Sequence, residues 1–345
     1  MRQTPSDPNR ATLALAEPPH HAYGLMNPDR PVLLIPAVTG AGAPDARTRQ
    51  AAAALQRQGL ASALGPGVSW GRPVVARRRA SPVPGKRRIR SPGRHPVRSS
   101  ESWELLRDFS ERLAQRVSQC LLTSQLALVI GGDHSCAVGT WSGVARALRL
   151  GRAGGGLGLL WVDAHLDAHT PRSSASKQPH GMPLAMLLGE GPPALTRLAG
   201  AAPVLQADRV VVLGARSWEP AEARRLARLG VLVITAEEVR AQGLADCMTR
   251  ALHRVRGGDG ATLPWGLSLD VDAIDPQEAP ATGTPEPDGL SMDALSLALA
   301  GLAWTPGLQA LELTEYNPRL DPDCRTAEGL TRLLAALLAA PDRSA

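Results

Sequence analysis

Residues 161–180 read WVDAHLDAHTPRSSASKQPH, and this is the most informative stretch of the sequence. Asp163, His165 and Asp167 follow the apolar run 157–162 and alternate with small or apolar residues. Successive side chains of a strand point to opposite faces, so residues two apart share one face. We therefore expect two carboxylates and an imidazole to converge where a buried strand ends. Groups packed this closely destabilise one another unless a positive charge lies between them, and a divalent metal ion is the simplest occupant.

Apolar runs of strand length recur along the chain, with helical stretches between them. They predict strands at 31–36, 126–130, 157–162, 209–213, 231–235, 266–271 and 308–313. Apolar residues at helical spacing predict helices at 46–64, 101–120, 138–150, 184–188, 219–229, 237–254, 292–302 and 327–339. Continuous apolar strands that alternate with helices are typical of a parallel sheet covered on both faces. We therefore expect one α/β domain over 31–345, built as a three-layer, doubly wound, mostly parallel sheet.

Polar residues at the ends of three other expected strands extend the candidate site. His134 follows the second expected strand, at the end of the motif Gly-Gly-Asp-His. Asp270 and Asp272 end the sixth, again two residues apart, and Glu315 follows the seventh. His180 lies in the loop after the third strand. Open parallel sheets of this class bind ligands at the carboxyl edge of their strands, which is where we expect these groups to meet.

The candidate metal ligands are two imidazoles and four carboxylates: His134, Asp163, His165, Asp167, Asp270 and Asp272. One ion cannot use all six, whereas two ions that share bridging carboxylates can. Ligands rich in carboxylate and free of thiolate suit Mn²⁺ better than zinc. Two such ions, typically about 3.5–4 Å apart, lower the pKa of a bridging water enough to give hydroxide near neutral pH. The set therefore predicts a hydrolase that attacks a planar electrophilic carbon.

Each of these motifs alone has an ordinary structural explanation. A single Asp-x-Asp at a strand end is usually a turn or a helix cap, and a single histidine is usually a half-buried residue. Four of the eight histidines, however, fall within 47 residues, at strand ends or in the loops that follow them. This joint occurrence favours the metal site.

Composition places the chain among globular proteins without a membrane span. It has 345 residues, 43% of them hydrophobic, and no run of 18 or more apolar residues. The first ten residues, MRQTPSDPNR, lack the apolar segment of a secretory signal. Cys120, Cys136, Cys247 and Cys324 show no CxxC spacing, so we expect reduced thiols in a cytoplasmic protein. Cys136 is interpreted as a small buried helix residue rather than a metal ligand.

Two segments lie outside this pattern. Residues 1–30 are rich in proline and polar residues, and we expect them to be poorly ordered. Residues 71–100 hold ten Lys or Arg and no acid, so the net charge of +6 is local, and the rest of the chain carries a net −4. The Pro, Gly and Ser content of 71–100 predicts a mobile basic surface loop. The segment has no aromatic residues for base stacking, so we favour a solvated insertion over nucleic-acid binding.

Five motifs in this order carry a resemblance to a known family. They are GGDHS (131–135), DAHLD (163–167), HG (180–181), SLDVDAIDP (268–276) and TEYNP (314–318). Together they resemble the ureohydrolase superfamily, and arginases most closely, over roughly residues 126–335. The segments 281–291 and 180–189 are also similar to arginases, whereas 31–64 matches the family's first strand and helix only loosely.

The resemblance implies two Mn²⁺ ions per subunit. The first is held by His134, Asp163, Asp167 and Asp270. The second is held by His165, Asp163, Asp270 and Asp272, so Asp163 and Asp270 bridge the pair. The resemblance also implies that a hydroxide between the ions attacks the guanidinium carbon of the substrate, releasing urea and an amine.

The resemblance gives catalytic roles to three residues. Glu315 matches the carboxylate that pairs with the guanidinium group, which suits the geometry of a planar cation. His180 matches the family's proton shuttle. Asp167 accepts a hydrogen bond from the bridging water and helps to protonate the leaving amine.

The distal, substrate-selecting positions depart from the arginase pattern. His169 stands where arginases usually carry Asn, and the family's paired hydroxyls fall on Ala175 and Ser176, so one hydroxyl remains. Glu219 occupies the position of the family's acidic residue that helps to hold the α-amino group of the substrate. Its side chain is one methylene longer than the usual Asp. The first expectation is hydrolysis of L-arginine to L-ornithine and urea. The alternatives are another guanidino substrate, such as guanidinobutyrate or agmatine, or a catalytically silent family member. The resemblance also implies a homo-oligomer, a trimer or a hexamer.

Overall fold

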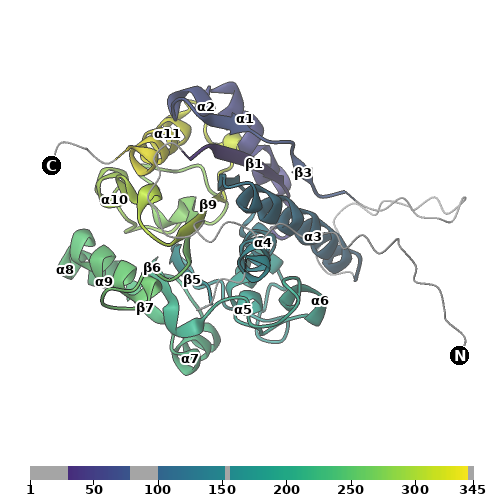
Figure 1. Cartoon of the computed structure of the whole chain (residues 1–345). Helices are drawn as coiled ribbons and strands as arrows, with labels where there is room; N and C mark the ends of the chain where they lie inside the picture. The colour runs from purple at the N-terminus through teal and green to yellow at the C-terminus, as the bar shows by residue number, and fades with distance from the viewer. Residues whose placement is uncertain (1–29, 78–99, 152–155, 341–345) are drawn as a thin grey trace, which may run out of the picture.

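The computed structural model describes residues 30–77, 100–151 and 156–340, whose strands form a single parallel sheet (Figure 1). The strand order is β2-β1-β4-β9-β8-β5-β6-β7, and β3 also pairs with β1. Every strand pair in it is parallel. The strands are β1 (Val32–Val38), β2 (Val68–Trp70), β3 (Val74–Val75), β4 (Leu126–Ile130), β5 (Gly158–Val162), β6 (Val210–Ala215), β7 (Leu232–Thr235), β8 (Trp265–Asp270) and β9 (Leu308–Thr314).

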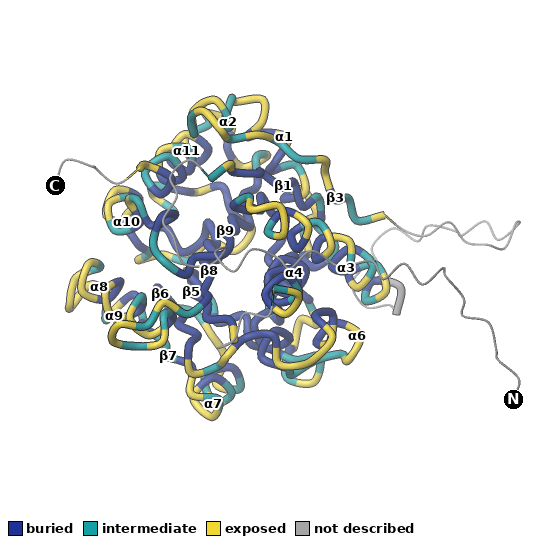
Figure 2. Tube along the Cα trace, in the orientation of Figure 1, coloured by how far each residue is buried: buried dark blue, intermediate teal, exposed yellow. Residues whose placement is uncertain are grey.

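Two hydrophobic cores, one on each face of the sheet, hold the helices in place. One face is covered by α1 (Ala51–Arg57), α2 (Leu60–Ala63), α8 (Ala236–Gln242), α9 (Leu244–Arg256), α10 (Met292–Leu299) and α11 (Arg325–Leu338). The other is covered by α3 (Ser100–Leu122), α4 (Ala137–Leu150), α5 (Pro183–Leu187), α6 (Pro193–Thr196) and α7 (Pro220–Leu229). Figure 2 shows β5, β8 and β9 as buried tubes at the centre of the sheet, with the more exposed α2, α7 and α8 at the edge of the molecule. The three-layer, doubly wound fold predicted from the sequence is confirmed.

Two predicted helices are each broken by a glycine. The segment 46–64 forms a 3-10 turn, α1 and α2, and Gly59 between the two helices has a left-handed φ of 79°. The segment 237–254 forms α8 and α9, separated by Gly243 with φ 88°. Residues with a side chain rarely adopt such φ values, so glycine permits the change of direction. The prediction of one continuous helix in each segment was wrong.

The predicted basic loop 71–100 contains a strand at its start. Val74 and Val75 form β3 and pair with Ala37 and Val38 of β1, and Val74 joins the core. Burying apolar surface of this short valine pair is favourable, although the surrounding segment is strongly basic. The prediction considered the charge of the whole segment and therefore missed the strand. Residues 78–99, which hold most of the basic side chains, lie outside the described residues, as do residues 1–29 of the predicted N-terminal extension.

The order of the strands brings four of their ends together. After β4 the chain passes to β5, and β8 and β9 later fill the space between them. The carboxyl ends of β4, β9, β8 and β5 are therefore neighbours at the centre of the sheet, where open α/β sheets bind ligands. Within the described residues, no helix combines the length and the apolar character that a membrane crossing needs.

Candidate metal centre and active site

The six predicted metal ligands converge at this central edge. His134 begins the 3-10 turn after β4, and Asp163, His165 and Asp167 lie in the loop directly after β5. Asp270 is the last residue of β8, and Asp272 lies in the 3-10 turn that follows it. The side chains form two groups of closely spaced ligand atoms, His134–Asp163–Asp270 and Asp163–His165–Asp272.

His134 is the centre of the more buried group. Its Nδ1 lies 2.9 Å from Asp270, 3.1 Å from Asp167 and 3.2 Å from Asp163, measured to the Oδ2 atom of each. Although it is buried, this nitrogen has no hydrogen-bond partner among the described residues. The opposite ring nitrogen, Nε2, lies 3.0 Å from the hydroxyl of Ser268. A ring fixed at one nitrogen, with the other aimed unpaired at three carboxylates, fits a metal ligand.

His165 is the centre of the second, more exposed group. Its Nδ1 lies 3.1 Å from Asp272 Oδ2 and 3.6 Å from Asp163 Oδ1. Asp163 therefore presents one carboxylate oxygen to each imidazole, which fits a carboxylate shared by two ions. The His165 side chain is 25% exposed, against 1% for His134. Asp270 groups with His134 rather than with His165.

The electrostatics of this cluster favour an added cation. Burial and the charge of Asp163 raise the pKa of Asp167 to about 6. Burial, together with Asp272 and Asp163, holds the pKa of Asp270 well above its usual value. Burial alone lowers the pKa of His134, but the adjacent carboxylates of Asp163, Asp167 and Asp270 raise it overall. Four carboxylates thus face two imidazoles in a buried space, and divalent ions neutralise such an excess of negative charge.

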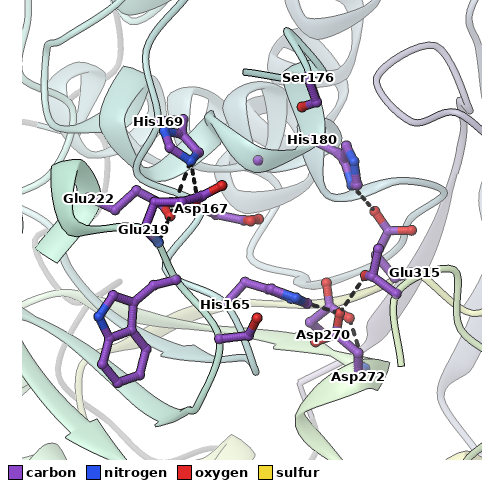
Figure 3. Close-up of a pocket in the computed structure, with 14 residues that line it drawn as sticks. His165, Asp167, His169, Ser176, His180, Glu219, Glu222, Asp270, Asp272 and Glu315 are labelled. Carbon is purple, nitrogen blue, oxygen red and sulfur yellow. Dashed lines mark hydrogen bonds and ion pairs between the residues drawn. The ribbon is translucent and has the colours of Figure 1, made fainter. Parts of the chain in front are cut away.

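His180 and Glu315 face one another on the other side of the cavity (Figure 3). Nδ1 of His180 lies 3.3 Å from Oε1 of Glu315. Burial lowers the pKa of His180, but the ion pair with Glu315 outweighs it and raises this pKa to about 9. The same Oε1 accepts a hydrogen bond of 2.9 Å from the backbone N–H of His134. Glu315 therefore contacts both His134, in the more buried group of candidate ligands, and His180.

Two of the candidate catalytic carboxylates have a strained backbone. Asp167 has φ 47° and Glu315 has φ 62°, in the left-handed region that residues other than glycine rarely adopt. Each is held by backbone hydrogen bonds: Leu184 donates to the carbonyl of Asp167, and Glu315 donates to the carbonyl of Gly132. Strain of this kind, worth about 1–3 kcal/mol per residue, concentrates at functional sites.

A cavity of about 480 Å³ connects the metal groups to the distal positions. It is lined at one end by Asp270, Asp272, His180 and Glu315, and at the other by residues near α7. All four predicted substrate-binding residues line it: His169, Ser176, Glu219 and Glu315. The structure therefore brings the predicted distal contacts into one pocket with four of the six predicted ligands, His165, Asp167, Asp270 and Asp272.

At the distal end, His169 is bound by two glutamates. Its Nε2 lies 2.5 Å from Glu219 and 3.2 Å from Glu222, and its Nδ1 lies 3.1 Å from the hydroxyl of Ser173. Glu219 also caps α7 in a reciprocal capping box with Glu222. Burial and the neighbouring Glu219 raise the pKa of Glu222 to about 8. His169, Glu219 and Glu222 thus satisfy one another without a metal ion.

Four further residues of the site were not predicted from the sequence. Glu222 was not predicted, although the spacing Glu-Pro-Ala-Glu is typical of a helix N-terminus. Ser268 and Glu312 are polar residues inside apolar strands, and this unusual position in the sequence could have indicated a role in the site. Ser268 donates to Glu312 at 2.8 Å and contacts His134, and Glu312 also accepts from Trp141 and Thr140. The fourth, Thr284, donates to Asp272 Oδ2 at 3.0 Å.

The cysteines lie outside the ligand groups. All four are unpaired. Cys136 is fully buried beside α4, and its Sγ lies 3.5 Å from Oε1 of Glu312. This position agrees with its interpretation as a small buried residue.

Comparison with known proteins defines the class. A model of the Arginase family matches residues 86–340. The arginases of Bacillus caldovelox and Bacillus subtilis are 37% and 36% identical over 229 residues, which cover 66% of this chain and 73% and 74% of those proteins. The crystal structure of arginase from Bacillus subtilis has a TM-score of 0.76 at 28% identity and covers 90% of this chain and 99% of that one. An Entamoeba histolytica arginase in complex with L-ornithine reaches the same TM-score at 22% identity, a likeness of fold alone.

Fold, family model and relatives agree, and the chain belongs to the arginase family. It is a hydrolase of the class that acts on guanidino groups. The resemblance to ureohydrolases that the sequence motifs indicated is thus confirmed.

Proposed function

We propose that the protein is a binuclear manganese hydrolase that converts L-arginine to L-ornithine and urea. The observation that carries this proposal is the pair of imidazoles whose Nδ1 atoms face carboxylates and share Asp163, beside a cavity that also contains Glu315. The relatives that are named arginase support arginine as the first substrate. Manganese is favoured by a ligand set of carboxylates and imidazoles without thiolate.

The six ligand residues would hold two ions that supply a nucleophile derived from water at neutral pH. Glu315 offers a carboxylate to the guanidinium group of the substrate, which lowers the mobility of the reacting carbon. The imidazole of His180, which can carry a proton, lies 3.3 Å from the same carboxylate and is therefore close to the bound guanidinium group. His180 then acts as the proton shuttle of the site. Asp167, beside His134, helps to protonate the leaving amine.

The distal end decides between arginine and its alternatives. His169 there lies within ion-pair distance of two glutamates, and none of the described residues that line the cavity is a Lys or an Arg. A free carboxylate of the substrate would depend on His169 and Ser176, whereas an ammonium group would find Glu219 and Glu222. This arrangement leaves agmatine and guanidinobutyrate as alternative substrates.

Urea release from a panel of arginine, agmatine and 4-guanidinobutyrate, measured with manganese-loaded protein, tests the proposal. We expect arginine to have the highest kcat/KM. Fast turnover of another member with none of arginine would replace the substrate, and a metal-loaded protein that releases urea from none would favour the catalytically silent alternative. The homo-oligomer, as a trimer or hexamer, and the cytoplasmic location stay predictions from the sequence.

A further inference from the structure

The segment from Thr284 to Pro287 lies against the more exposed ligand group and is held by Arg216. The guanidinium group of Arg216 is half buried and donates to backbone carbonyls on two sides. Its acceptors are the carbonyl oxygens of Asp272, Glu286 and Pro287 at 2.7–2.8 Å, and those of Gly214 and Ala273 at 3.3 Å. One arginine thus fixes this segment to the turn that carries Asp272.

Glu286 is the side chain that this arrangement brings to His165. Its Oε1 lies 3.6 Å from Nε2 of His165, on the side of the ring opposite Asp272 and Asp163. If Nδ1 of His165 binds an ion, the neutral ring carries its proton on Nε2. A carboxylate facing that proton fixes the orientation of the ring and increases its basicity as a ligand.

Thr284 adds a second contact from the same segment. Its hydroxyl donates to Oδ2 of Asp272 at 3.0 Å. The segment therefore contacts both His165 and Asp272, the two residues that distinguish this ligand group from the other one. His134 has a different support, Ser268 and Glu312 on the neighbouring strands.

The two ligand groups also differ in how accessible they are. The side chain of His165 is 25% exposed and that of Glu286 is 34% exposed, whereas His134 and Ser268 are buried. A partly exposed imidazole is less confined by packing than a buried one, so an orienting carboxylate has most effect at His165.

We infer that Glu286, held in place by Arg216, is a positioning residue for the metal ion of the His165 group and not for the ion of the His134 group. The inference rests on the proposed two-metal centre. It does not depend on which guanidino compound is the substrate. Neither residue touches the substrate in this account, since both act through His165 and Asp272.

The test is a manganese titration of metal-free full-length protein, followed by calorimetry and by elemental analysis after dialysis. For Glu286→Ala we expect one of two binding steps to weaken about 10- to 100-fold, the usual effect of removing such a partner, while the other stays unchanged. Glu286→Gln, which keeps an oxygen that can accept from Nε2, should recover part of the loss. Glu104→Gln, an exposed glutamate on α3, is the matched control and should bind like wild type.

Crystals of Glu286→Ala grown at limiting manganese identify the affected ion. We expect the anomalous peak beside His165 to lose occupancy and the peak beside His134 to keep it. Equal loss at both sites, or unchanged affinity at both, would overturn the inference. Because these measurements use no substrate, a wild-type protein that binds two ions but hydrolyses nothing leaves the inference standing and refutes only the proposed function.

Arg216→Lys tests the other half of the inference. A lysine cannot reach the separate carbonyls that the guanidinium fork reaches, so we expect the same selective loss. If Arg216 acts through Glu286, the double variant should bind manganese no more weakly than Glu286→Ala alone. Losses that multiply in the double variant would contradict this. If Arg216→Lys does not fold, the Glu286 variants decide the inference alone.

Discussion

Replacing Ser268 by alanine removes the contact between His134, in the more buried group of candidate ligands, and the strands β8 and β9. The Ser268 hydroxyl lies 3.0 Å from Nε2 of His134 and donates to Glu312 at 2.8 Å, and the residue is fully buried. Glu312 keeps Thr140 and Trp141 as partners, so the loss falls mainly on His134. A buried polar group left without a partner costs about 1–3 kcal/mol.

The expected magnitude for metal binding follows from the same contact. Loss of the partner that orients a metal-bound imidazole weakens affinity about 10- to 100-fold. At about 1.4 kcal/mol per tenfold change, this corresponds to about 1.4–2.8 kcal/mol of binding free energy. We expect the ion beside His134 to be affected and the ion beside His165 to stay.

The assay is a manganese titration of Ser268→Ala, with anomalous diffraction at limiting manganese to identify the weakened site. Ser110→Ala is the matched control, because the Ser110 hydroxyl is buried on α3 and no residue that the structure describes forms a hydrogen bond with it. We expect this control to bind manganese like wild type. Unchanged affinity in Ser268→Ala, or a loss confined to the site beside His165, would refute the reasoning.

Three further predictions concern the bridge, the proton-carrying group and the distal end. Asp163→Ala should lose both manganese ions, as measured by elemental analysis, and retention of one ion would contradict its shared position between two imidazoles. His180 has a folded-state pKa of about 9, above its ordinary 6.5, so the stability it contributes in metal-free protein should be complete below pH 6.5 and disappear as pH rises through 9. Glu315→Gln should reduce that pH dependence in urea unfolding, because Glu315 is the largest of the causes that raise the pKa of His180, and an unaltered profile would exclude the ion pair as its cause. His169→Ala should raise KM for arginine about tenfold while kcat and manganese content stay constant, as expected for a contact made equally in ground and transition states; a fall in kcat alone would contradict a distal role.

The sequence predicts the candidate metal ligands because their chemistry and their position in the fold coincide. Asp163, His165 and Asp167 are two residues apart at the end of an apolar run, and a parallel sheet brings such ends together. His134 and Asp270 follow the same rule on neighbouring strands. These residues could therefore be assembled into one site before their distances were known.

The residues that support the ligands could not be predicted in the same way. Glu312 and Ser268 lie on different strands, and only the register of β8 with β9 makes them partners. Glu286 lies beside His165, and Arg216, which is distant in sequence, donates to the backbone carbonyls of Glu286 and Asp272. Such contacts depend on tertiary packing, and strand or helix periodicity carries no information about them.

The most direct test of the two-metal centre is diffraction from crystals grown with excess manganese, recorded on both sides of the manganese absorption edge. We expect two anomalous peaks about 3.5–4 Å apart, one beside His134 and one beside His165, with Asp163 in contact with both. A single peak, or none among these side chains, would contradict the account.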